Sequence, residues 1–186
     1  MAKVDLNPIF DQVHGKVGDL VLKRYHSGVV MSRIGGTDRP MSAAQLAQQE
    51  RFRAATTYSK MALMDPAARD LYRAAAQERD LPIVAVMVAD FFNAPTILNV
   101  DAAEYEGRAG DRIKILADDD FAVASVQVAI SAGGTLVEQG LAVETPVDSG
   151  RYYYTATQAA PTGTPLTVAV TVTDRPGNTT SQTVNV

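Results

Sequence analysis

The sequence contains no cysteine and no tryptophan, and only two histidines occur among its 186 residues. The absence of cysteine excludes disulfide bonds, thiolate metal sites and cysteine nucleophiles. His14 and His26 flank a segment of β-forming residues. We interpret them as ordinary turn or surface residues, and a paired metal or acid–base role is the alternative.

Long apolar runs are also missing. The longest, from Leu81 to Ala89, is far too short to cross a bilayer and contains Pro82. The opening segment MAKVDLNPIF has no apolar stretch after its single lysine, so we expect no signal peptide. We therefore expect synthesis in the cytoplasm and no membrane insertion. The final location stays open between a cellular filament, the extracellular space and a virion.

The composition that remains is that of a globular protein, with 46% hydrophobic and 20% charged residues. The net charge of −4 argues against a nucleic-acid partner. Residues 1–94 carry 12 Lys and Arg against 10 Asp and Glu, whereas residues 95–186 carry 5 against 11. This asymmetry favours head-to-tail contacts between copies, with chance as the alternative explanation.

The stretch GDLVLKRYHSGVVMSRIGG, from Gly18 to Gly36, predicts a β-hairpin. β-Forming residues fill Val17–Tyr25 and Val29–Ile34, and the connection HSG fits a three-residue loop that ends in a left-handed Gly28. Both faces of the hairpin are expected to be partly apolar, as in strands covered on both sides. No strand-like segment follows for about sixty residues, so we expect the sheet partner on another copy.

An open apolar strand edge is a liability in a monomer and a docking surface in a polymer. The hairpin is therefore predicted to be the self-assembly surface, with a basic edge. Its predicted contact residues are Val17, Leu20, Val21, Leu22, Lys23, Arg24, Tyr25, Val29, Val30, Met31, Arg33 and Ile34.

Two helices are predicted after the hairpin. Ser42 and Gln45 have the spacing of a capping box, which opens a helix running to about Met64. The pair Asp65-Pro66 combines an N-cap with proline at the first helical position. It predicts a second helix that ends near Glu78.

The segment from Ile83 to Asn93 is predicted to form a third helix. Helical spacing places a set of mainly apolar residues on one face, namely Ile83, Val86, Met87 and Asp90. The alternation of Val84, Val86 and Val88 leaves a buried strand as the alternative.

After Pro95 short strands alternate with turns to the end of the chain, as in an antiparallel sandwich. We expect seven strands, near 96–100, 112–117, 123–131, 135–139, 151–157, 166–173 and 180–186. The chain is thus predicted to be an α+β protein with a hairpin–helical assembly module over 1–94 and a β-sandwich over 95–186.

Three motifs in the second half resemble bacterial immunoglobulin-like domains. Asp174, Gly177 and Asn178 match the TDxAGN turn of their final hairpin, although Arg175-Pro176 departs from the usual small residue before the glycine. The segments DDDFAVASVQVAI and SGRYYYTAT resemble the acidic turn before a central strand and the tyrosine-rich strand of the same family. The resemblance covers about residues 96–186 and implies a sandwich that acts as a spacer, adhesin or virion decoration.

The first half is similar to small bacterial and phage proteins of unknown function that open with GKxGD and a hairpin. Gly15, Lys16, Gly18 and Asp19 carry this resemblance, which implies no activity. The same residues superficially suggest a phosphate loop, but they lack the Walker spacing and precede a strand.

Two further groups of residues are candidates for ligand binding. Asp118, Asp119 and Asp120 have oxygen ligands suitable for calcium, although a solvated acidic turn is the simpler interpretation. Tyr152, Tyr153 and Tyr154 are an aromatic candidate for binding sugar, with packing within a strand as the alternative. We expect no cofactor and no catalytic residue, because no acid–base set is clustered.

These observations favour a non-enzymatic structural protein whose partners are other copies of itself, assembled into a filament, tube or layer. One alternative is a phage virion component, such as a capsid decoration or tail protein. Another is a module whose immunoglobulin-like half binds a surface sugar or protein.

Overall fold

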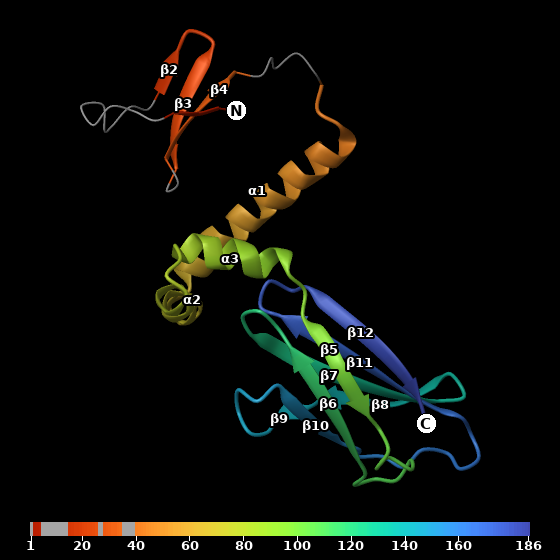
Figure 1. The fold of residues 1–186 in the computed structure, drawn as a ribbon. Helices are drawn as coiled ribbons and strands as arrows, with labels where there is room; N and C mark the ends of the chain where they lie inside the picture. The colour runs from red at the N-terminus through yellow and green to blue at the C-terminus, as the bar shows by residue number, and fades with distance from the viewer. Residues whose placement is uncertain (1, 5–14, 26–27, 35–39) are drawn as a thin grey trace. The chain divides into compact units, whose positions relative to one another are not determined.

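The computed structural model describes residues 2–4, 15–25, 28–34 and 40–186, and within them the fold is mixed α+β. The chain forms two compact units, Met1–Ala47 and Gln48–Val186, and Figure 1 labels all of their elements except β1. The predicted boundary at Pro95 lies inside the second unit. Whether residues 95–186 fold alone stays a prediction.

The first unit contains a four-stranded antiparallel sheet with the order β1-β4-β3-β2. Its strands are β1 (Ala2–Val4), β2 (Gly15–Val17), β3 (Leu20–Tyr25) and β4 (Gly28–Arg33). The predicted hairpin is formed by β3 and β4. The expectation that it lacks a strand partner in its own chain is wrong, because β1 pairs with β4 and β2 pairs with β3. Each of these edge strands has three residues, too few to give an alternating pattern.

A turn at Gly18 and Asp19 interrupts the strand that was predicted from Val17 to Tyr25. Gly18 has φ 60, and the first central position of a type II′ turn requires such a positive value. The turn places Val17 directly opposite Leu20. Gly28, expected in the connecting loop, belongs to β4 and pairs with Tyr25; residues 26–27 lie outside the described part of the chain.

The turn also changes the predicted distribution of side chains. Residues directly opposite each other in an antiparallel pair lie on the same face of a sheet. The pairs Val17–Leu20 and Leu22–Met31 therefore share a face, and Lys16–Val21 and Lys23–Val30 share the other. Each face therefore carries apolar residues, as expected from the sequence, and each also carries basic residues. The face of Val17 and Leu20 has more of the apolar residues, with Arg33 opposite Leu20. We call it the apolar face and define it by Val17, Leu20, Leu22, Val29 and Met31.

Three helices follow, and all are predicted from the sequence. α1 (Ala43–Met64) begins with the expected capping box, in which the Gln45 backbone N–H donates to Ser42 Oγ (3.2 Å) and the Ser42 N–H donates to Gln45 Oε1 (2.8 Å). α2 (Pro66–Glu78) is capped by Asp65, which accepts from the Ala67 N–H (3.0 Å). The segment left open between helix and strand is α3 (Ile83–Phe92).

The helices share a small core on the second unit. Around a fully buried Tyr72 it contains Ala62, Ala68, Ala76, Val86 and Met87. Phe121, from the β-rich part of the unit, packs against this cluster. Its ring stacks on Tyr72, with centroids 4.1 Å apart and planes 13° from parallel.

The rest of the second unit is a β-sandwich of two four-stranded antiparallel sheets. One sheet has the order β5-β6-β10-β9, and the other β12-β11-β7-β8. The strands are β5 (Thr96–Asp101), β6 (Arg112–Asp118), β7 (Val123–Ala132), β8 (Thr135–Leu141), β9 (Val143–Glu144), β10 (Arg151–Thr155), β11 (Leu166–Asp174) and β12 (Thr179–Asn185). Seven were predicted within a few residues, and the two-residue β9 was not.

The sandwich core follows the alternation seen in the sequence. Val168, Val170 and Val172 of β11 are completely buried, and their neighbours on the strand are less so. Residues of both sheets form one hydrophobic cluster, including Ile113 and Ile115 of β6 and Val128 and Ile130 of β7. Burial of each such side chain stabilises the fold by about 1.5–3 kcal/mol.

Candidate functional site

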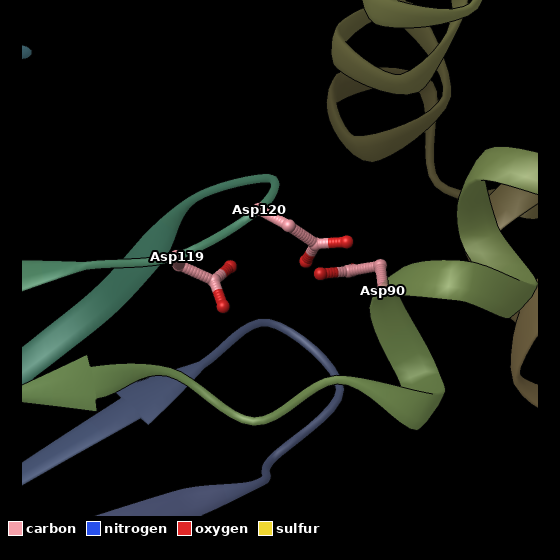
Figure 2. A group of neighbouring side chains, drawn as sticks. All are labelled: Asp90, Asp119 and Asp120. Carbon is pink, nitrogen blue, oxygen red and sulfur yellow. The ribbon is translucent and has the colours of Figure 1, made fainter.

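Three carboxylates converge where the helices meet the sandwich in the second unit. They belong to Asp90 of α3 and to Asp119 and Asp120 of the turn between β6 and β7 (Figure 2). One oxygen atom of each lies within 4.8 Å of those of the other two. Figure 2 shows the Asp90 side chain pointing from the helix towards the two aspartates of the turn.

Asp90 is a charged residue on the buried face of a helix. It lies on the same face of α3 as Val86 and Met87, and only 1% of its surface is exposed. The Tyr72 hydroxyl donates a hydrogen bond to Asp90 Oδ2, and the Tyr58 and Tyr72 hydroxyl oxygens are 2.7 Å apart. Asp90 Oδ1 is buried without a hydrogen-bond partner among the described residues.

The turn after β6 positions the other two carboxylates. Asp119 Oδ2 accepts from the backbone N–H groups of Phe121 (3.3 Å) and Ala122 (2.9 Å), which closes the turn. Asp119 Oδ1 is buried and, within the described part of the chain, accepts no hydrogen bond. Asp120 Oδ2 accepts from the Asn93 amide (2.8 Å), and its main-chain oxygen accepts from Arg79.

A second turn, between β11 and β12, connects the sandwich to the end of α3. Asp174 Oδ1 accepts from the backbone N–H groups of Gly177 (2.8 Å) and Asn178 (2.6 Å). The Asn178 amide donates to Asp174 Oδ2 (2.6 Å) and to the main-chain oxygens of Phe91 and Asn93 (3.2 Å each). The motif residues noted in the sequence thus close this turn and bind the helix terminus. Gly177 has φ 96, a conformation that other residues rarely adopt.

The electrostatics of the cluster are unfavourable for three free carboxylates. Burial, together with the negative charges of Asp119, Asp174 and Asp120, raises the pKa of Asp90 to about 7 and outweighs the Tyr72 hydrogen bond, which lowers it. Burial also raises the pKa of Asp119, against the effect of its two backbone hydrogen bonds. No ion pair between Lys or Arg and these aspartates occurs among the described residues.

Of the predicted acidic triplet, two residues belong to the cluster and one does not. Asp118 is the last residue of β6 and is exposed, so it lies outside the cluster. Asp90 takes the third place, and no sequence pattern connects it with the turn. The available signal was an aspartate on an otherwise apolar helix face, because a charge at such a position requires a partner.

The tyrosine-rich strand contributes mainly to packing. Tyr152 and Tyr154 are 8% and 5% exposed and belong to the sandwich core. Between them, Tyr153 points to the other side of β10, where the Arg112 guanidinium lies 5.1 Å from its ring centroid. His14 and His26 lie outside the described residues.

The predicted assembly residues are brought together by the sheet of the first unit. Val17, Leu20 and Ile34 are 65%, 39% and 38% exposed, whereas Val29 is buried at 8%. Leu22, Val21, Val30 and Met31 are half-buried, and Lys23 and Arg33 are exposed. The side chains of Arg24 and Tyr25 lie outside the description, although both residues belong to β3.

Comparison of the chain with protein-family models, with curated proteins and with solved structures found no match. None of the helices in the described ranges is long and apolar enough to span a membrane. The function is therefore inferred from the sheet of the first unit and the acidic cluster of the second.

Proposed function

We propose that the chain is a non-enzymatic structural protein that self-assembles through the apolar face of its first unit and displays an immunoglobulin-like sandwich. The observation that carries this proposal is how few apolar side chains the sheet buries among the residues whose burial the structure describes. Val29 is the one buried hydrophobic side chain of the first unit among those residues.

A unit of 47 residues is close to the lower size limit of an independent fold. Chains below about 40 residues usually require disulfides, metals or oligomerisation, and somewhat larger ones remain marginal. Cysteine is absent from the sequence, so disulfides cannot contribute. Contact with another copy would bury the exposed apolar side chains of the described sheet.

The apolar face is suited to such a contact. Val17 and Leu20 lie side by side on it and remain 65% and 39% exposed. Further apolar side chains are exposed along α1, including Phe52 (56%), Met61 (67%) and Met64 (82%). Within each unit, such exposed apolar residues mark candidate interaction sites, as larger apolar patches do in soluble proteins.

The charge distribution favours a second copy as the occupant. The first 94 residues carry a small excess of basic residues, and the remainder carries 11 acidic residues against 5 basic ones. A basic surface of one copy therefore complements the acidic sandwich of the next. Such a contact joins two different surfaces, and it produces an open polymer when its rotation does not close a ring.

The strand order supports the immunoglobulin-like interpretation of the displayed part. Immunoglobulin domains have strands A, B, E and D in one sheet and G, F and C in the other. In chain order, β5, β6, β9 and β10 take the places of A, B, D and E, while β7, β11 and β12 take those of C, F and G. β8 adds a strand beside C.

The test is the assembly state of the purified full-length protein, followed by light scattering and electron microscopy. We expect ordered polymers from the parent chain and their loss in Leu20→Asp, because a carboxylate would be buried in a dry contact at a cost of several kcal/mol. Leu20 is partly exposed within the unit, so the substitution acts mainly on the contact between copies.

Ser32→Asp is the matched control, since it makes the same change in charge on the other face of the same sheet, where Ser32 lies opposite Val21. This variant should still polymerise. A parent chain that stays monomeric at high concentration, or a Leu20→Asp chain that polymerises like the parent, would overturn the proposal.

A further inference from the structure

The acidic cluster of the second unit combines two features. Three carboxylates each place an oxygen within 4.8 Å of the others. One of them, Asp90, is only 1% exposed. Its Oδ1 atom has no hydrogen-bond partner among the described residues. A buried carboxylate oxygen left without a partner costs about 1–3 kcal/mol or more, so a native fold normally satisfies it.

We propose that Asp90, Asp119 and Asp120 bind a calcium ion that connects the end of α3 to the β6–β7 turn. Calcium coordinates carboxylate oxygens at about 2.3–2.6 Å, so one ion reaches oxygens up to about 5 Å apart. The spacing of the three oxygens fits this range. The ion would satisfy the orphaned Oδ1 atoms of Asp90 and Asp119, which no donor of the described residues reaches.

The surrounding hydrogen bonds already orient the ligands. One oxygen of each carboxylate is held by a donor: Tyr72 for Asp90, two backbone N–H groups for Asp119 and the Asn93 amide for Asp120. The second oxygen of each remains available for the cation. Such outer contacts fix ligand orientation in metal sites.

Charge balance supports a cation at this place. Asp174 is 2% exposed and adds its negative charge to those that act on Asp90 and Asp119. Arg79 approaches the turn but donates to the main-chain oxygen of Asp120 rather than to a carboxylate. A divalent ion would offset the repulsion, whereas a proton on Asp90 would offset only part of it.

The experiment is thermal unfolding of the full-length protein after chelation, titrated with calcium, with magnesium, or with sodium chloride at matched ionic strength. We expect a saturable rise in the melting temperature with calcium, because a ligand stabilises the state that binds it. Calorimetric titration should give one ion per chain. Magnesium should act more weakly, since it requires a tighter octahedral site.

Variants separate binding from general charge effects. Asp120→Asn, at an exposed position, should weaken calcium binding at least about tenfold because the site loses one charged ligand. Asp118→Asn removes a charge from the adjacent residue outside the cluster and should keep the parent response. Asp90→Asn should raise the melting temperature of the chelated protein, by removing repulsion, and abolish the response to calcium.

Terbium luminescence provides a second measurement that does not depend on stability. Tyr72, in contact with Asp90, should sensitise a bound terbium ion, and calcium should compete with it. A melting temperature that follows ionic strength alone would overturn the proposal. So would an Asp118→Asn chain that loses the response as fully as Asp120→Asn, or terbium emission that calcium does not displace.

Discussion

At the scale of single residues, the three consecutive tyrosines of β10 have two different roles, packing in the core and contact with a surface arginine. Tyr152 and Tyr154 point into the sandwich core. Tyr153 points away from it, and the Arg112 guanidinium lies over its ring. Strand alternation explains this division, because successive side chains lie on opposite faces. Packing was the alternative to sugar binding for these tyrosines, and burial favours packing for two of the three.

The buried tyrosines predict a loss of stability at alkaline pH. Burial, with smaller contributions from nearby acidic residues, raises the pKa of Tyr152 and of Tyr154 to about 12. Between about pH 10 and pH 12 the unfolded chain has released these protons and the folded chain still holds them, so the free energy of unfolding falls as pH rises. Urea unfolding followed at several pH values across this window measures the decline.

Tyr152→Phe provides the comparison, since it keeps the ring and removes the ionisable hydroxyl. Its urea midpoint should decline less steeply than that of the parent over the same window, while the two behave alike at neutral pH apart from a constant offset. Equal slopes for the two proteins would show that Tyr152 ionisation does not contribute.

At the scale of elements, helix boundaries followed from local chemistry, while the acidic cluster did not. Ser42 with Gln45 and Asp65 with Pro66 specify helix starts through side-chain and backbone hydrogen bonds a few residues apart. The cluster joins Asp90 to residues about thirty positions away, and its formation depends on how α3 packs against a turn. No local pattern encodes that distance, so the sequence alone predicted only the two adjacent members.

In the first unit, sequence-based prediction was limited by the shortness of the strands. The hairpin of β3 and β4 was predicted from β-forming residues, but its partners β1 and β2 were not. Strands of three residues carry no measurable alternation, and pairing to an existing hairpin is what defines them.

The turn between β11 and β12 connects the sandwich to α3, so we expect that a change in this turn destabilises both parts. Asn178 is the donor shared by the carboxylate of Asp174 and the main-chain oxygens of Phe91 and Asn93 at the C-terminal end of α3. Asn178→Ala should lower the free energy of unfolding of the full chain by about 1–3 kcal/mol, because several acceptors lose their donor. Chemical denaturation of the two proteins measures the difference.

Asn185→Ala is the matched control, since Asn185 is exposed near the other end of β12. Its effect should stay within about 0.5 kcal/mol, as for surface substitutions without special contacts. A loss of equal size in the two variants would contradict the role assigned to Asn178.

At the scale of the whole molecule, the two units differ in how they obtain stability. The second has a continuous sandwich core and a separate helical core, whereas the first exposes much of its apolar face. The predicted division at Pro95 separates the two cores of the second unit rather than the two units themselves.

A fragment from Ala94 to Val186 should therefore fold alone as a β-protein, because its core residues all belong to the two sheets and their connections. It should be less stable than the full chain, having lost the contacts of Asn178 with Phe91 and of Asp120 with Arg79. Circular dichroism and thermal unfolding measure both properties. A random-coil spectrum would contradict the independence of the sandwich.

The turn at Gly18 and Asp19 has a consequence for how the first unit can vary. The number of residues between Val17 and Leu20 decides which face each side chain of β2 joins. Shifting the pairing by one residue would exchange Lys16 and Val17 between the faces without altering composition. The sheet is thus subject to a parity constraint: conservative substitutions leave its pattern intact, whereas a single insertion or deletion in this turn inverts the pattern of an entire strand.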